Sequence, residues 1–176
     1  MKILAFAASN SSRSINKQLV SYATSLLHGV DVELLDLNDF EMPLFSVDRE
    51  DSLGELPQAK AFLQHIASAD GVIVSFAEHN GSYTVAYKNL FDWASRIETK
   101  VYQNKPMVLL ATSPGRRGGA SVLESALKII PHLGGDIRGS LSIPQFNDNF
   151  DSNKGQLTDP ELQAKLHATV SSLLSN

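Results

Sequence analysis

Short apolar runs alternate with longer amphipathic stretches along the whole chain. The run at 71–75 reads Gly-Val-Ile-Val-Ser, an unbroken stretch of strand length, which is typical of a parallel strand buried on both faces. After such a run, apolar residues recur at the three- and four-residue spacing of an amphipathic helix. This alternation predicts an α/β protein whose parallel sheet is covered by helices on both faces.

The order of these elements predicts the sheet topology. Gly29 predicts the end of the first helix, and Thr158, Pro160 and Glu161 together indicate the start of the last one. A single flavodoxin-like domain over residues 1–176, with five parallel strands in the order 2-1-3-4-5, accommodates this sequence of elements. The expected strands are 2–8, 32–37, 71–75, 107–112 and 137–143; the expected helices are about 15–28, 56–67, 84–96, 120–133 and 160 onward, with a long loop over 42–54.

The loop after the first strand is rich in hydroxyl and amide side chains and carries one arginine. Ser14 is expected to cap the following helix, which leaves the N–H groups of its first turn free to bind an anion. The chain contains neither G-x-G-x-x-G nor G-x-x-x-x-G-K-[ST], so the dinucleotide fingerprint and the Walker A loop are both absent. A hydroxyl-lined loop suits a terminal monophosphate, and FMN is the leading candidate cofactor.

Two more polar, glycine-containing loops follow the third and fourth expected strands, at 77–82 and 113–119. The carboxyl ends of parallel strands meet at one edge of the sheet, so all three loops are expected to converge on one crevice. Glycines there let the backbone approach an aromatic ring without a Cβ in the way.

The composition excludes several kinds of partner and cofactor. A net charge of −4 gives no electrostatic case for nucleic acid or an anionic membrane as a partner. The absence of cysteine excludes disulfides, thiolate catalysis and cysteine-based zinc or iron–sulfur sites, so redox chemistry requires an organic cofactor. The first apolar run is too short for a signal peptide, whose apolar region spans about 7–15 residues, so we expect a cytoplasmic protein.

The three loops resemble those of the NAD(P)H-dependent FMN reductase family, a flavodoxin-like group that includes quinone, azo-dye and chromate reductases. The family's phosphate motif, G-S-x-R-x-x-S-x-N, reads Ala8-Ser-Asn-Ser-Ser-Arg-Ser-Ile-Asn16 in this chain. Alanine replaces the glycine at position 8, and Ser11 stands where the family has arginine. Arg13, two residues on, is the candidate to supply that charge.

The second family motif, P-E-Y-N-x-S-x-P-x-x-L-K-N-x-x-D-W, corresponds to residues 77–93 and is the more specific of the two. Ala77 and Thr84 replace its prolines, and His79 replaces its tyrosine. The loop at 113–119 is similar to the family's glycine-rich loop. The positions that match in register are Glu78, Asn80, Ser82, Lys88, Asn89, Asp92 and Trp93.

The resemblance implies FMN as the cofactor and NADPH or NADH as the co-substrate. No catalytic side chain and no metal are expected, because the flavin carries the chemistry. Arg116 and Arg117 are predicted to hold the phosphates of NADPH. The predicted FMN-binding residues are Ser9, Ser11, Arg13, Ser14, Ile15, Asn16, Ala77, Glu78, His79, Asn80, Gly81, Ser113, Gly115, Gly118 and Gly119.

Two of these loops carry more specific expectations. We expect Glu78 to order its loop and His79 to flank the flavin, rather than the two forming an acid–base pair, because adjacent loop residues usually point apart. Backbone N–H groups near Gly118 and Gly119, ahead of a helix N-terminus, are expected to stabilise the negative charge of reduced flavin.

The predicted function is an FMN-dependent NAD(P)H oxidoreductase that works by ping-pong kinetics. Its oxidant is expected to be a small molecule: a quinone, an azo compound, free flavin or a metal oxyanion. The alternative is a flavodoxin-like electron carrier or redox sensor without NADPH turnover. A receiver domain is disfavoured because Ala7, Ala8 and Ser75 occupy its acidic positions, and a serine hydrolase because G-x-S-x-G is missing.

The expected helix at 84–96 carries apolar residues around more of its circumference than one core-facing side requires. Deep burial and a subunit interface both explain this pattern. Members of the resembled family form dimers or tetramers through this region, so we expect a homodimer or homotetramer. A charge at Tyr87 or Phe91 is then expected to dissociate it.

Overall fold

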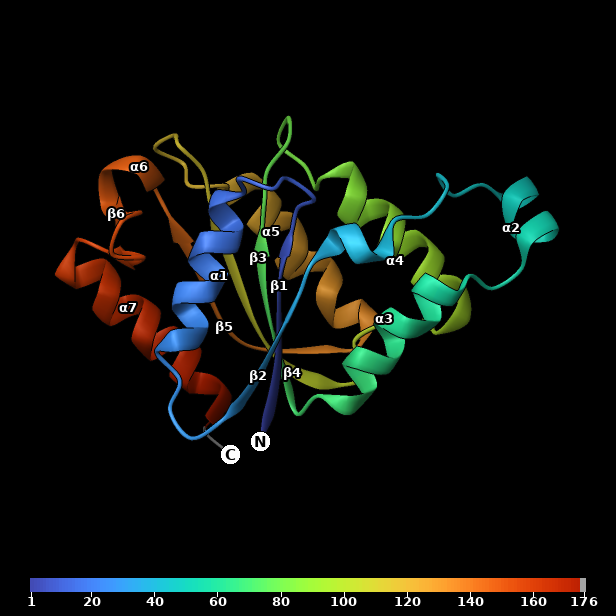
Figure 1. Ribbon diagram of the computed structural model, residues 1–176, viewed down its shortest axis with the longest axis horizontal. Helices are drawn as coiled ribbons and strands as arrows, with labels where there is room; N and C mark the ends of the chain where they lie inside the picture. Colours follow the sequence, from blue (N-terminus) through green and yellow to red (C-terminus); the bar gives the residue numbers. More distant parts are fainter. Residues whose placement is uncertain (175–176) are drawn as a thin grey trace.

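The computed structural model describes residues 1–174, and its centre is a five-stranded parallel sheet in the order β2-β1-β3-β4-β5 (Figure 1). This confirms the predicted flavodoxin-like fold and strand order. Each expected strand is present within a few residues of its predicted bounds. The strands are β1 (Lys2–Ala8), β2 (Asp31–Leu35), β3 (Gly71–Phe76), β4 (Lys105–Thr112) and β5 (Gly135–Ile143).

Helices cover both faces of this sheet. Along β1 the side chains alternate: Leu4, Phe6 and Ala8 pack into one apolar cluster, and the residues between them pack into the other. The first cluster contains α3 (Pro57–Ser68), α4 (Val85–Ile97) and α5 (Ala120–Ile129), whereas the second contains α1 (Ile15–Ser25) and α7 (Pro160–Ser171). β1, β3 and most of β4 are therefore buried on both sides, which explains their unbroken apolar runs.

Several boundaries and short elements differ from the prediction. α1 ends at Ser25, ahead of Gly29, and the cap of α7 is Asp159, not Thr158, because the Asp159 carboxylate accepts the N–H groups of Glu161 and Leu162. The expected helix at 120–133 is divided into α5 and a 3₁₀ turn. Elements that the sequence did not predict are η1 (Leu37–Phe40), α2 (Val47–Leu53), η2 (Ile130–Leu133), α6 (Phe146–Asn149), the β6–β7 pair (Phe150–Asp151 and Gln156–Leu157) and η3 (Ser172–Leu174).

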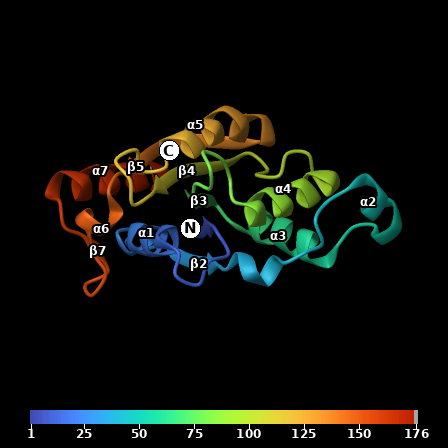
Figure 2. The ribbon, with the colours of Figure 1, turned by 90° about the horizontal axis from the view of Figure 1, so that it is seen from above.

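The long segment between β2 and α3 is not a plain loop. It contains α2, which lies at one end of the molecule (Figures 1 and 2), has no buried residue, and is linked to α4 by an ion pair between Glu50 and Arg96 at 2.8 Å. Only two of its seven residues are apolar, Val47 and Leu53, so no periodic pattern marked it as a helix.

Residues 42–45, which we call the strap, are bound to α4 by side chains of the second motif. The Asn89 Nδ2 group donates to the carbonyl oxygens of Met42 (3.0 Å) and Pro43 (3.1 Å), and Asn89 Oδ1 accepts from the Phe45 N–H (2.8 Å). Trp93 Nε1 donates to the Pro43 oxygen at 2.8 Å. Two residues that match the motif therefore fix the path of the chain after β2.

Much of the apolar surface of α4 is used inside the monomer. Tyr87 is only 3% exposed, and its hydroxyl oxygen lies 2.7 Å from that of Tyr102. Burial raises the pKa of both phenols, so both stay protonated at neutral pH. Tyr87 is a core residue, and the expectation that it lies on a subunit surface is wrong. Phe91, which is half-buried, and Val85, which is 67% exposed, remain as apolar residues of α4 that reach the surface.

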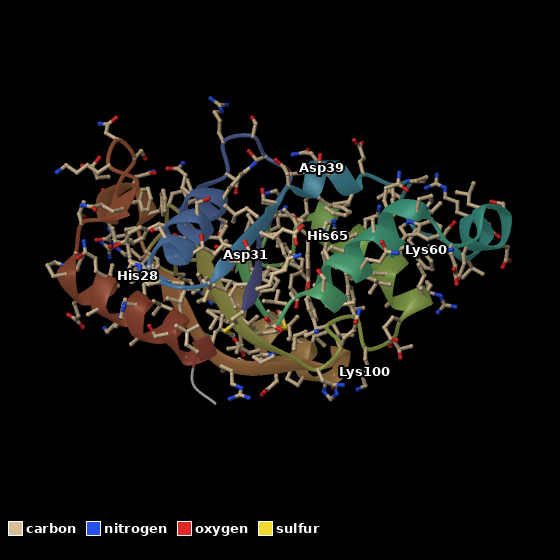
Figure 3. The ribbon with its side chains drawn as sticks, turned by 60° about the horizontal axis from the view of Figure 1, so that its bottom comes forward. His28, Asp31, Asp39, Lys60, His65 and Lys100 are labelled. Atoms are coloured by element: carbon tan, nitrogen blue, oxygen red, sulfur yellow. The ribbon has the colours of Figure 1, made fainter. Side chains whose placement is uncertain are left out.

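None of the helices within residues 1–174 combines the length and the apolar character that crossing a bilayer requires. The same residues contain no cluster of three carboxylate or histidine side chains that could hold a metal. Figure 3 shows two of the histidines apart from each other, His28 in the loop after α1 and His65 on α3.

Candidate functional site

The three polar loops meet at one end of the sheet, beyond the carboxyl ends of β1, β3 and β4 (Figure 1, top). The structure therefore brings together the segments that carry the predicted site residues. Among them, Ser11, Arg13, His79, Asn80, Gly81, Gly115, Arg116 and Arg117 are exposed, Ile15, Glu78 and Ser113 are half-buried, and Ser9, Ser14, Asn16, Ala77, Gly118 and Gly119 are buried.

The first loop presents donors that suit an anion. Ser14 Oγ caps α1 by accepting the Lys17 N–H (3.3 Å), and Ser9 Oγ accepts the Ser11 N–H (3.2 Å). Both hydroxyls keep their own proton for a ligand. Within residues 1–174, the first-turn N–H groups of Ile15 and Asn16 have no hydrogen-bond acceptor. Free N–H groups at a helix start, beside two hydroxyls, are the donors that an anion requires, so this loop is the candidate anion site.

The charged side chains near this loop have different roles. The Lys17 ammonium binds the Asp36 carboxylate at the end of β2 and holds the pKa of that carboxyl below its usual value. Arg13 is exposed and makes no ion pair with any residue in 1–174. It is therefore the cation of this loop that is available to a ligand.

Asn16 connects three elements through its side chain. Its Oδ1 atom accepts from the Ser75 hydroxyl (2.8 Å) and the Thr112 N–H (3.1 Å), and its Nδ2 group donates to the Thr112 oxygen (3.2 Å). This amide, which is 2% exposed, thus joins α1 to the ends of β3 and β4. Sequence reasoning assigned Asn16 to phosphate and missed this role. The signal for it was Ser75, a hydroxyl at the end of an apolar strand.

The second loop is a tight hairpin. His79 and Ser82 exchange two backbone hydrogen bonds, of 3.0 and 3.1 Å, around Asn80 and Gly81. The φ angles of these two central residues are +53° and +77°, as a type I′ turn requires. No atom lies within 4 Å of a Cβ built on Gly81, so the tip of the hairpin is open. The Asn-Gly pair is a strong hairpin signal that the sequence analysis did not use.

Thr84, where the family has proline, links this hairpin to β1. Its Oγ1 accepts the Tyr87 N–H (3.2 Å) as the cap of α4, and its hydroxyl donates to the Ala8 carbonyl oxygen (2.9 Å). Proline offers neither interaction, so the substitution adds a tie between the first and second loops.

Glu78 connects the second loop to the third. Its Oε2 atom accepts the Val122 N–H at 3.0 Å, in the first turn of α5. The residue at the cap position of that helix, Gly119, has no side chain and adopts a left-handed conformation. Glu78 therefore caps α5 from a segment 44 residues away and places a carboxylate at the positive end of its dipole.

The third loop is packed against the end of β5. A Cβ on Gly118 would lie 2.5 Å from Ser142 Oγ and 2.7 Å from the Ile143 oxygen, and the Gly118 N–H donates to the Gly115 oxygen. The protein itself requires glycine at 118. The expectation that the Gly118 N–H is free to stabilise a flavin anion is wrong, since that N–H is already bonded to the Gly115 oxygen. The same expectation for the Gly119 N–H is not contradicted, because that group has no hydrogen-bond acceptor within residues 1–174.

The two arginines of the third loop differ in their contacts. Arg117 Nη2 donates to Ser121 Oγ at 3.0 Å. Arg116 is exposed and forms no side-chain hydrogen bond or ion pair with residues 1–174. Both lie beside Gly115, whose Cβ direction is nearly open, with Ser113 Oγ at 3.8 Å as the nearest atom.

The sequence model of the family described as NADPH-dependent FMN reductase matches residues 1–148. The chain belongs to this family. The resemblance inferred from the three loops is thereby confirmed. All three loops lie within the matched residues 1–148.

Named relatives agree with this family. The chain is 33% identical over 121 residues to an NAD(P)H-dependent FMN reductase from Pseudomonas aeruginosa, a match that covers 68% of this chain and 64% of the relative. It is 35% identical over 122 residues, with the same coverage, to a 2-hydroxy-1,4-benzoquinone reductase from a Burkholderia species. The chain thus spans just under two thirds of the length of these two relatives.

Solved structures agree on the fold. FerB, a flavoenzyme NAD(P)H:(acceptor) oxidoreductase from Paracoccus denitrificans, is similar with a TM-score of 0.78 and 24% identity, over 98% of this chain and 94% of FerB. A flavodoxin from Pseudomonas aeruginosa gives a TM-score of 0.59 at 15% identity, over 99% of this chain and all of that one. At these identities the likeness is evidence for the fold alone.

The cap that Glu78 provides can be tested without any cofactor. Glu78→Ala should cost about 1–2 kcal/mol, the usual loss for a helix cap, and so lower Tm by roughly 2–8 °C. Glu78→Gln keeps an acceptor oxygen and should lose much less. The control is Glu124→Ala on the exposed side of the same helix, where a solvated pair with Lys128 is lost. Equal melting temperatures for Glu78→Ala and Glu124→Ala would contradict the assignment.

Proposed function

We propose that this protein is an FMN-dependent NAD(P)H oxidoreductase that reduces a small-molecule oxidant. The observation that carries the proposal is the convergence of an anion-binding helix start, an open hairpin and a glycine-containing loop at the carboxyl ends of β1, β3 and β4. Membership of the NADPH-dependent FMN reductase family supports the same conclusion.

The residues at the first loop fit a flavin monophosphate. The hydroxyls of Ser9 and Ser14 and the free N–H groups of Ile15 and Asn16 supply donors, and Arg13 supplies the charge. Both oxygen lone pairs of the Asn16 side chain are engaged, so a phosphate contact is left to its backbone N–H and one amide hydrogen. The open backbone at Gly81 and Gly115 leaves room for a flat ring on the second and third loops.

Bound FMN would accept a hydride from NAD(P)H and pass two electrons to a quinone, azo compound, free flavin or metal oxyanion in a second half-reaction, which gives ping-pong kinetics. The chain's own residues bind and orient. Glu78 is occupied by the α5 N-terminus and is therefore not a free acid or base. A steady-state assay of NADPH oxidation with menadione tests the activity. An FMN-loaded protein that consumes no NADPH would instead be an electron carrier.

The phosphate assignment predicts a ligand-specific effect. A hydrogen bond to a charged group contributes about 1.5–3 kcal/mol, so Ser9→Ala should weaken FMN binding roughly 10- to 150-fold. Riboflavin lacks the phosphate, and its affinity should not change. Ser12→Ala, an exposed serine in the same loop, is the control. Titration by flavin fluorescence measures both ligands, and equal losses for FMN and riboflavin would refute the assignment.

Arg116 and Arg117 predict a preference for NADPH over NADH. A guanidinium binds the extra 2′-phosphate, but the site is open to solvent, so screening should limit the preference to about tenfold in kcat/KM. Replacing both arginines with alanine should abolish this preference and leave FMN binding unchanged. The preference of the wild type should also fall as salt is added. If the double variant still prefers NADPH, Arg13 becomes the next candidate for that phosphate.

We also propose that the exposed side of α4 forms a subunit interface, in a homodimer or homotetramer. Phe91 is half-buried and stacks on Tyr87 with ring centroids 6.3 Å apart, which leaves part of its ring at the surface. Sedimentation should show an oligomer at micromolar concentration, and Phe91→Asp should dissociate it. Leu53→Asp on α2 should not. A monomeric wild type would disprove the interface.

A further inference from the structure

A cavity of about 330 Å³ lies beside the candidate site and is lined by none of its predicted NADPH residues. Its walls come from four segments: the first loop, the hairpin, the segment from η1 to the strap, and the first turns of α4. The volume falls within the range of small-molecule pockets. The lining residues are Asn10, Leu37, Asn38, Phe40, Glu41, Met42, Leu44, His79, Thr84, Val85, Ala86 and Asn89.

Two strongly exposed apolar side chains belong to the lining of this cavity. Val85 and Leu44 are 67% and 59% exposed, and with Val47 they are the three most exposed large apolar side chains in residues 1–174. Two of these three line this cavity, Leu44 from the strap and Val85 from the first turn of α4. Apolar side chains left in water at the mouth of a pocket indicate a surface that is covered by an apolar ligand.

The polar lining contains one carboxylate and neither lysine nor arginine. Asn10, Asn38 and His79 supply donors and acceptors. Glu41 is the charged residue of the lining. A phosphate, sulfonate or metal oxyanion would find no cation here and would face a negative charge, so the cavity suits an uncharged molecule.

The cavity is held open by contacts already described. Asn89 and Trp93 fix the strap on α4, and Thr84 fixes the start of that helix to β1. A preformed pocket binds without first paying the entropy of ordering its walls. Asn10 and His79 belong to the first and second loops, so a ligand in this cavity lies against the candidate flavin site.

We propose that this cavity binds the electron acceptor, and that Glu41 makes it select uncharged aromatic acceptors over anionic ones. The inference rests on the proposed oxidoreductase function and names the acceptor's chemistry and place. Its ring would lie between Val85 and Leu44, with its carbonyl oxygens within reach of amide donors from Asn10 or Asn38. Sulfonated azo dyes and metal oxyanions are then poor acceptors for this chain.

The place of binding can be tested by titrating the FMN-loaded protein with menadione, with methyl signals observed by NMR. The methyls of Val85 and Leu44 should shift and saturate. Val47 and Leu53, exposed methyl-bearing residues of α2 outside the cavity, are the control and should stay in place. The titration measures binding and requires no turnover. A failed NADPH assay would therefore overturn the proposed function, while the titration would still show whether menadione binds in the cavity.

The selectivity can be tested by the ratio of kcat/KM for menadione to that for a naphthoquinone sulfonate. Glu41→Gln should lower this ratio about fivefold, because removing the repulsion of the sulfonate raises kcat/KM for the sulfonated acceptor. Asp39→Asn is the matched control (Figure 3), because it removes the same charge two residues away, outside the lining. It should change the ratio less than about twofold, as screening predicts.

Four results would overturn the proposal. Shifts of the methyl groups of all four residues would indicate non-specific adsorption, and no shift at Val85 and Leu44 would place menadione elsewhere. Chemical shifts of these methyl groups that depend on the protein concentration and not on the menadione concentration would mean that a second copy of the chain covers the cavity. Equal effects of Glu41→Gln and Asp39→Asn would show that overall charge, not the cavity, sets the selectivity.

Discussion

The hydrogen bonds of the Asn16 side chain hold the candidate site together. They join the first turn of α1 to the ends of β3 and β4 in a place that water does not reach. Removing the amide would leave a buried hydroxyl and a buried backbone pair without partners, and unpaired polar groups in such surroundings are costly. The Asn16 amide thus adds polar ties to the apolar packing that holds the start of α1, the candidate anion site, against the sheet.

Two further ties complete the arrangement. Thr84 binds the second loop to the end of β1, and Glu78 binds it to the start of α5. Each tie runs from a side chain to a backbone group of another loop or strand end. The three loops are thus fixed to one another directly, and a flat cofactor placed among them meets walls that are already ordered. The inward turn of the Asn16 side chain also leaves the first-turn N–H groups of α1 free for a ligand.

The sequence predicted the sheet well because burial on both faces leaves an unmistakable apolar run, and the strand order follows from the alternation with helices. It also located the three loops, because each loop directly follows one of these strands. It could not predict where polar side chains point: Asn16 was equally suited to bind a ligand or a neighbouring strand, and Glu78 finds its partner 44 residues away. Gly118 shows the same limit. The sequence does not reveal whether a glycine is needed because β5 packs against it, as here, or because a ligand does. α2 was not predicted because none of its residues is buried, so no apolar pattern marks it.

The strap has an evolutionary consequence. The hydrogen bonds of Asn89 and Trp93 hold the strap through the backbone of Met42, Pro43 and Phe45. Met42 is buried in the core and Phe45 packs edge-on against Trp93, with ring centroids 5.1 Å apart, so these two side chains are constrained as well. Leu44 is 59% exposed and lines the cavity, so its substitution can change the shape and polarity of the wall without moving the chain that carries it. A lineage can diversify what the wall accepts at this position while α4 and the sheet stay under constant selection, and the same separation makes it the natural position to randomise in directed evolution.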